Sequence, residues 1–183
     1  MKKILVFLIA SVFVLTACSK GGEGDPIDLD DLGKDTGLIE FKLNGKAQKH
    51  TFLVSAGEKP HNGINDITAA GGKGEKNKNG DRPSIDFFLV ELSGAKVGKV
   101  YTSVNSELVG QYYQPAAKGE FINFSSDNSD INDNRGYFEL VFTEISDRGM
   151  KGRFHGTMYD HDHNKLVVED ARFDLLYTDF IFD

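Results

Sequence analysis

Alternation of apolar and polar residues dominates the chain from Leu38 onward. In Ile39–Leu43 every second residue is apolar, and Asn44-Gly45 comes next, which is a strong signal for a tight hairpin turn. Successive side chains of a strand point to opposite faces, so a period of two predicts strands with one face in a core. The pattern therefore predicts a β-hairpin at the start of an all-β domain.

The same pattern recurs to the end of the chain. A return strand is expected through Phe52 and Val54, followed by a strand at 64–70 and a mobile loop at 71–83, rich in Gly, Lys and Asn. Shorter strands are expected near 98–103, 109–114 and 119–125, then a strand at 136–145 and a closing hairpin of 149–159 and 165–177. No window has a sustained helical period. About nine or ten antiparallel strands predict a β-sandwich or a barrel-like domain, with a slight preference for the sandwich.

One segment departs from simple alternation. Ser84–Leu92 reads SIDFFLVEL, with Ile85, Phe87 and Leu89 on one face and further apolar residues on the other. An apolar pattern on both faces predicts a central strand that is buried on both sides.

The first residues have the features of an export signal. Lys2 and Lys3 precede Ile4–Leu15, an unbroken run of apolar or small residues. About a dozen such residues are too few to span a membrane, which needs roughly 20, but they suit the core of a signal peptide. The segment 1–17 is therefore predicted to be a signal peptide.

The end of this signal resembles the lipobox of bacterial lipoproteins. Leu15-Thr16-Ala17-Cys18 has a leucine three residues before the cysteine and small residues between them. The resemblance implies cleavage before Cys18, a thioether-linked diacylglycerol on its sulfur, and acylation of the new amino terminus. An ordinary secretory signal with an incidental cysteine is the alternative. The expected partner is thus a membrane, bound through the lipid on Cys18.

The composition of the chain beyond the signal peptide narrows its possible partners. Without residues 1–17 the chain has 166 residues, with 19 basic and 28 acidic side chains and a formal charge of −9. Such an acidic chain argues against nucleic acid as a partner. Residues 18–37, rich in Gly and Asp, predict a flexible tether, although a short strand or helical turn around Ile27–Leu32 is an alternative. Residues 38–183 then form one all-β domain without internal disulfides, since Cys18 is the only cysteine.

Two segments resemble small uncharacterised lipoproteins of the Bacteroidetes type. IEFKLNGKAQ at 39–48 is similar to their opening hairpin with an Asn-Gly-Lys turn, and residues 149–174 are similar to their closing Gly-x-Phe-x-Gly hairpin. Ala171 stands where a glycine is usual. The resemblance implies an all-β lipoprotein domain of the cell envelope, most often at the outer membrane, and it carries no known chemistry. Gly152 and Gly156 would relieve crowding on a twisted strand, while Phe154 fills the core.

Two polar clusters contain residue types that bind metals. Asp160–Asn164 includes His161 and His163, and His155 lies a few residues earlier, but Asp and Asn are also typical of hairpin turns, which is the preferred interpretation. Asp127–Asn134 imitates the start of a calcium loop but lacks its glycine and its closing acid, which excludes an EF-hand and leaves an irregular calcium loop as an alternative. No metal ligand is assigned.

No catalytic or cofactor-binding residue is assigned either, and the protein is not expected to be an enzyme. The chain has no Gly-x-Ser-x-Gly elbow, its lone cysteine is the predicted lipid site, and Gly71–Gly74 lacks the context of a phosphate loop. A pair of neighbouring carboxylates that could hydrolyse a glycoside is to be expected in any acidic chain. This possibility therefore gives no support to a glycosidase.

Tyrosines supply the best binding hypothesis. An outward row drawn from Tyr101, Tyr112, Tyr113, Tyr137 and Tyr159 would stack on a sugar or a peptide, whereas tyrosines that cap the rim of the core are the preferred interpretation. The expected function is a membrane-anchored binding or interaction module of the cell envelope, with a glycan, peptide or envelope protein as partner. An extracytoplasmic hydrolase with an unrecognised site and a structural envelope component are the alternatives.

Overall fold

The computed structural model describes residues 37–61, 64–73 and 81–177. The predicted signal peptide, Cys18, all but the last residue of the predicted tether, and residues 74–80 of the predicted loop lie outside these ranges. The described part of the chain contains ten strands and one 3-10 turn at Ala117–Gly119. The prediction of an all-β domain of about ten strands is confirmed.

The strands follow the predicted order closely, and most of their bounds agree within a few residues. They are β1 (Gly37–Leu43), β2 (Lys46–His61), β3 (Ile64–Lys73), β4 (Ser84–Val90), β5 (Val100–Thr102), β6 (Glu107–Pro115), β7 (Phe121–Ser125), β8 (Tyr137–Ser146), β9 (Gly149–Tyr159) and β10 (Lys165–Tyr177).

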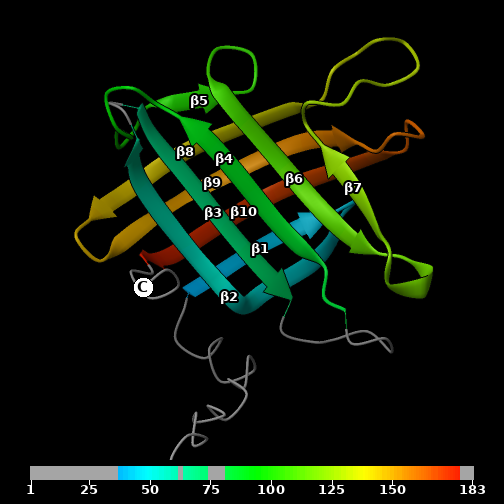
Figure 1. The fold of residues 1–183 in the computed structure, drawn as a ribbon, viewed down its shortest axis with the longest axis horizontal. Helices are drawn as coiled ribbons and strands as arrows, with labels where there is room; N and C mark the ends of the chain where they lie inside the picture. The colour runs from blue at the N-terminus through cyan, green and yellow to red at the C-terminus, as the bar shows by residue number, and fades with distance from the viewer. Residues whose placement is uncertain (1–36, 62–63, 74–80, 178–183) are drawn as a thin grey trace, which may run out of the picture.

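Eight of these strands close an antiparallel barrel. Around the ring the order is β1-β2-β3-β4-β6-β7-β9-β10, and β1 completes it by pairing with both β2 and β10. The remaining strands extend from the barrel, since β8 pairs with β9 and β5 pairs with β8. In Figure 1, β2, β3, β4 and β6 cross in front of β1, β10, β9 and β8, so the barrel is flattened into two layers. Pairing of β1 with β10 thus makes the domain a barrel, and the slight preference for a sandwich is wrong.

The first hairpin forms as its sequence predicts. Asn44 and Gly45 have φ values of 47° and 78°, the left-handed conformation that a tight two-residue hairpin turn requires. The turn is also tied to β10, because the Asn44 side-chain oxygen accepts a hydrogen bond of 2.8 Å from the Val167 amide. The local signal and the barrel closure therefore support each other.

Phenylalanine rings fill the space between the two layers. The ring centroids of Phe138 and Phe154 lie 5.3 Å apart, and those of Phe87 and Phe173 lie 5.4 Å apart. All four side chains are buried. The expected core position of Phe154 is confirmed, and aromatic pairs at these distances add to the free energy of area burial.

Two glycines of β9 make this packing possible. A Cβ at Gly152 would lie 2.4 Å from a ring atom of Phe173, and one at Gly156 would lie 2.7 Å from a ring atom of Phe138. Since real Cβ atoms do not approach so closely, any larger residue would displace the rings. The role predicted for these glycines is confirmed.

The prediction that Ser84–Leu92 is buried on both sides is wrong. Ile85, Phe87 and Leu89 are buried, but Phe88 is 40% exposed and Leu92 is 68% exposed. In a barrel whose interior is the only core, a strand buries one face while the other points outward. The apolar residues on the second face of Ser84–Leu92 are therefore exposed or half-buried on the outside of the barrel.

Candidate functional site

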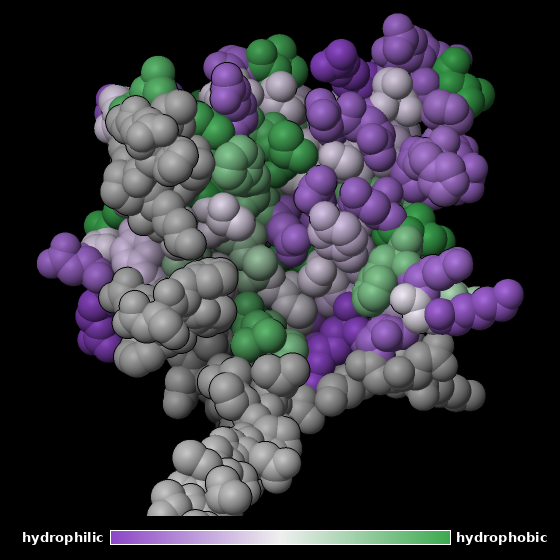
Figure 2. All heavy atoms as spheres, in the orientation of Figure 1, coloured by the Kyte–Doolittle hydropathy of each residue, from purple (hydrophilic) through white to green (hydrophobic). Residues whose placement is uncertain are grey.

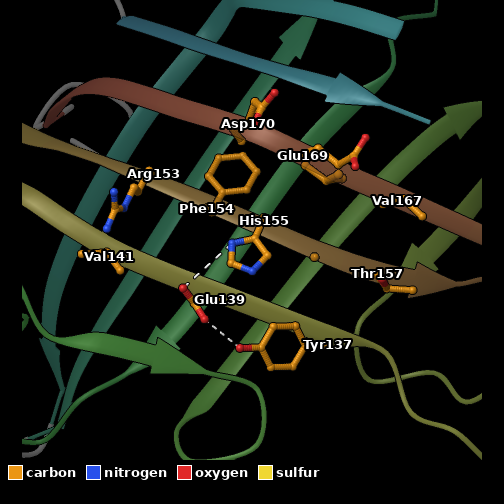
Figure 3. A pocket seen from close by; sticks show the side chains of 13 residues that line it. Tyr137, Glu139, Val141, Arg153, Phe154, His155, Thr157, Val167, Glu169 and Asp170 are labelled. Atoms are coloured by element: carbon orange, nitrogen blue, oxygen red, sulfur yellow. Dashed lines mark hydrogen bonds and ion pairs between the residues drawn. The ribbon is translucent and has the colours of Figure 1, made fainter. Parts of the chain in front are cut away.

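A groove of about 500 Å³ lies on the outer face of β8, β9 and β10. Alternate residues of each strand point into it, because side chains on one face of a strand recur with a period of two. Its principal polar side chains are those of Tyr137, Glu139, Arg153, His155 and Glu169, and Figure 3 shows them from close by.

A β-bulge in β10 shapes this groove. The pairing of β10 with β9 shifts between Val168 and Ala171, so that Glu169 and Asp170 together lie opposite the single residue His155. Asp170 has a φ of 48°, as expected where an extra residue bends a strand. Lys42 of β1 forms an ion pair of 2.7 Å with the Asp170 carboxylate. The bulge thus brings two acidic residues of β10, Glu169 and Asp170, to the groove.

Three side chains at the centre of the groove face one another. The Tyr137 hydroxyl donates a hydrogen bond of 2.8 Å to one oxygen of Glu139. Nδ1 of His155 lies 3.9 Å from the other oxygen of the same carboxylate, and the rings of Tyr137 and His155 are 6.0 Å apart. The hydrogen bond to Glu139 is the main reason that the pKa of Tyr137 is raised. The phenol therefore remains a donor at neutral pH.

Arg153 supplies a positive charge at one end of the groove. Its neighbours in the strand pairing are Val141 on β8 and Arg172 on β10. Arg172 binds the Glu40 carboxylate through its Nε at 2.7 Å, whereas no carboxylate of a described residue lies within ion-pair distance of Arg153. In Figure 3 the Arg153 side chain extends toward Val141 and away from His155. The groove thus presents a guanidinium that is available to a ligand.

Together these groups offer a carboxylate, an imidazole, a guanidinium and a phenol beside the apolar side chains of Val141 and Val167. Ligand sites of ordinary size occupy roughly 300–1,000 Å³ and combine apolar walls with a few polar groups. Within the described ranges, no group of three or more His, Cys, Asp or Glu side chains has the arrangement to hold a metal ion. The arrangement suits a small polar ligand.

The closing cluster folds as the predicted turn. One oxygen of the buried Asp160 accepts hydrogen bonds from the amides of Asp162 at 2.9 Å and Asn164 at 2.8 Å. Its other oxygen accepts a 2.8 Å hydrogen bond from the Asn164 side chain. His161 is exposed, and Nδ1 of His163 donates a 3.0 Å hydrogen bond to the Ser129 carbonyl. These side chains hydrogen-bond to the backbone or to one another within the turns. His155 lies apart from them on β9.

The second cluster repeats the same turn. One Asp130 oxygen accepts hydrogen bonds from the amides of Asn132 at 2.8 Å and Asn134 at 3.0 Å. Asp133, like His163 in the other turn, has a positive φ, 63° against 64°. The hydrogen bonds from Asn134 are the main reason that the pKa of the Asp130 carboxyl is lowered. Asp160–Asn164 and Asp130–Asn134 are thus both five-residue turns with an aspartate at the start and an asparagine at the end.

The outward row of tyrosines does not form. Tyr101, Tyr112 and Tyr159 are buried, and only Tyr113 and Tyr137 lie partly at the surface, on different layers of the barrel. The Tyr101 ring packs against Phe142 and the Tyr112 ring against Phe41, so both belong to the hydrophobic core. Of the five tyrosines considered for the row, only Tyr137 lines the groove.

The structure also places an imidazole in the core. His50 is fully buried, and its Nδ1 lies 2.8 Å from the Gly71 carbonyl, which accepts the proton on that nitrogen. Nε2 is therefore an unprotonated acceptor, and no described residue donates a hydrogen bond to it. Burial lowers the pKa of His50 to about 4. No sequence signal distinguishes this residue, because it occupies an ordinary inward position of β2.

Comparison with models of protein families, with curated protein sequences and with solved structures finds no match to this chain. Among the residues that the structure describes, no helix has the length and apolar character needed to cross a membrane.

Proposed function

We propose that this protein is a lipid-anchored binding module of the bacterial cell envelope, and that the groove on β8, β9 and β10 holds a saccharide. The observation that carries the proposal is the convergence of Tyr137, Glu139 and His155 in a groove of about 500 Å³ that opens outward. The tyrosines that suggested a binding row in the sequence play no part in it, apart from Tyr137.

The chemistry of the groove favours a ligand rich in hydroxyl groups. A carboxylate accepts hydrogen bonds from sugar hydroxyls, and a guanidinium donates hydrogen bonds to ring and hydroxyl oxygens. Tyr137 and His155 offer flat rings against which the C–H face of a sugar packs, and Val141 and Val167 offer apolar contact. An apolar ligand would remove Glu139 and Arg153 from water and leave Arg153 without a carboxylate partner, and burial of an unpaired charge costs several kcal/mol in general.

The anchor is proposed from the sequence alone. Leu15-Thr16-Ala17-Cys18 resembles a lipobox, and acyl chains on Cys18 would hold the protein on a membrane, most often the outer membrane. One chain binds a membrane only marginally, whereas two or three make attachment effectively permanent. A binding domain held in this way would capture saccharides at the cell surface or in the periplasm.

Titration of the full chain with labelled tetrasaccharides of glucose, mannose, xylose and N-acetylglucosamine tests the proposal. We expect at least one to bind, and we expect Glu139→Gln to weaken that binding about ten-fold, since a hydrogen bond to a charged group contributes about 1.5–3 kcal/mol. Glu144→Gln is the matched control, because Glu144 lies on the same strand outside the groove. Absence of binding, or equal losses in the two variants, would contradict the proposal.

One observation favours a hydrolase as the second candidate. Glu139 and Glu169 both line the groove, and a pair of carboxylates is what most glycosidases use to cleave a sugar linkage. Chromatography of the same tetrasaccharides after long incubation with the protein separates the two functions. Shortened products that Glu139→Gln no longer forms would favour the hydrolase over the binding module.

A further inference from the structure

A second surface lies on the opposite layer of the barrel, on the outer faces of β3, β4 and β6. At its centre is Asp86, which points outward because Ile85 and Phe87 on either side of it point into the core. The strand pairing places Ala70 of β3 on one side of Asp86 and Gln111 of β6 on the other. In Figure 1 these strands cross in front of β8, β9 and β10, so this surface is separate from the groove.

The residues around Asp86 are uncharged, and several are apolar. Phe88, two residues along β4, is flanked by Thr68 and Val109 and is 40% exposed. On the other side, the Tyr113 hydroxyl donates a 2.9 Å hydrogen bond to the Gln111 side-chain oxygen. Figure 2 views this layer from outside and shows hydrophilic residues near the middle of the face, with pale and green residues around them.

Asp86 has no cationic partner within the described ranges. No hydrogen bond or ion pair joins its carboxylate to another described residue, and burial alone raises its pKa to about 6. The pKa of Tyr113 is raised as well, first by burial and then by the negative charge of Asp86, so the two side chains lie close together. A carboxylate that is partly removed from water and unpaired destabilises the protein unless another molecule supplies the opposite charge.

We propose that this face is a docking surface for a protein segment that carries a lysine or arginine between apolar side chains, with the cation paired to Asp86. Charge complementarity argues for this occupant, since Asp86 and the exposed Glu107, which is paired with Val90 on the same outer face, are both negative, and the nearest neighbours of Asp86 are uncharged. Phe88 and Val109 would contact the apolar side chains on either side of that cation. Aromatic and aliphatic residues around one desolvated charge are typical of the centre of an interface. The proposal stands independently of saccharide binding.

Surface plasmon resonance with an immobilised peptide tests the docking surface. The peptide has one arginine flanked by valines, and its matched control has citrulline, which keeps the shape of arginine and removes the charge. We expect the full chain in mild detergent at pH 7.5 to bind the arginine peptide at least about ten-fold more tightly than the citrulline peptide. Asp86→Asn should abolish this preference, and Phe88→Thr should weaken binding of both peptides.

Asp133→Asn is the control variant for charge, because Asp133 is exposed in the turn between β7 and β8, outside the three strands of this face, and it should bind like the wild type. Equal binding of both peptides, or a preference for arginine that survives Asp86→Asn, would overturn the proposal. So would the absence of binding at millimolar peptide. Binding of the tetrasaccharides that is lost in Asp86→Asn and kept in Glu139→Gln would assign the face to a sugar instead.

Discussion

Replacement of Asp86 by asparagine should stabilise the protein at neutral and alkaline pH. Asparagine has the same shape and removes the charge that burial on the outer face of β4 disfavours. Burial raises the pKa of this carboxyl from 3.8 to about 6. The folded state therefore binds this proton more tightly than the unfolded state does, and the wild type loses stability as the pH rises through this interval.

The size of the effect can be worked out from that shift. At about 1.36 kcal/mol per pKa unit, a shift of about two units sets a ceiling of about 3 kcal/mol on the gain from Asp86→Asn above pH 7. The side chain retains some contact with water, which screens its charge, so about 1–2 kcal/mol is the expected gain. Below pH 3.8 the carboxyl is mainly protonated in both states, and most of the gain should disappear.

Urea unfolding of wild type and variant between pH 3.5 and pH 8, followed by circular dichroism, measures this difference directly. Other titrating groups, His50 among them, contribute equally to both proteins and cancel in the comparison. Asp133→Asn provides the control, since its side chain is exposed, and it should show no such pH-dependent gain. A variant no more stable than the wild type at pH 8, or one with the same gain at pH 3.5, would refute the reasoning. Greater stability together with lost peptide binding would show that the unpaired charge serves docking.

Three further predictions concern the anchor, the core and the buried imidazole. Cys18→Ser should give a precursor without acyl mass that no longer partitions into detergent, and an intact mass without lipid in the wild type would end the lipoprotein hypothesis. Phe154→Ala should lower the free energy of unfolding by about 3–5 kcal/mol, whereas His161→Ala in the exposed turn should change it by less than about 0.5 kcal/mol. Burial lowers the pKa of His50 from 6.5 to about 4, so its contribution to stability should be lost as the pH falls from about 6.5 toward 4. Replacing it with glutamine, which keeps a donor for the Gly71 carbonyl, should remove that dependence in urea titrations.

Local signals in the sequence determined the elements of this fold. The period of two from Ile39 onward marked the strands, Asn44-Gly45 marked the first turn, and Asp160–Asn164 marked the last. Each of these signals acts within a few residues, through backbone conformation or through the alternation of side chains. Gly152 and Gly156 were likewise readable, because a glycine between core residues of one strand implies a close approach.

Only the tertiary structure decided what covers each face and which strands meet. The sequence could not show that the second face of Ser84–Leu92 looks outward, because periodicity groups residues by face without saying whether another layer packs against that face. The groove was also hidden, since it depends on the bulge at Glu169 and Asp170, which exists only in the pairing of β10 with β9. The barrel itself depends on the contact of β1 with β10, and these strands lie more than a hundred residues apart along the chain. Such long-range pairing depends on how all strands bury their apolar faces together. No short stretch of the sequence carries that information.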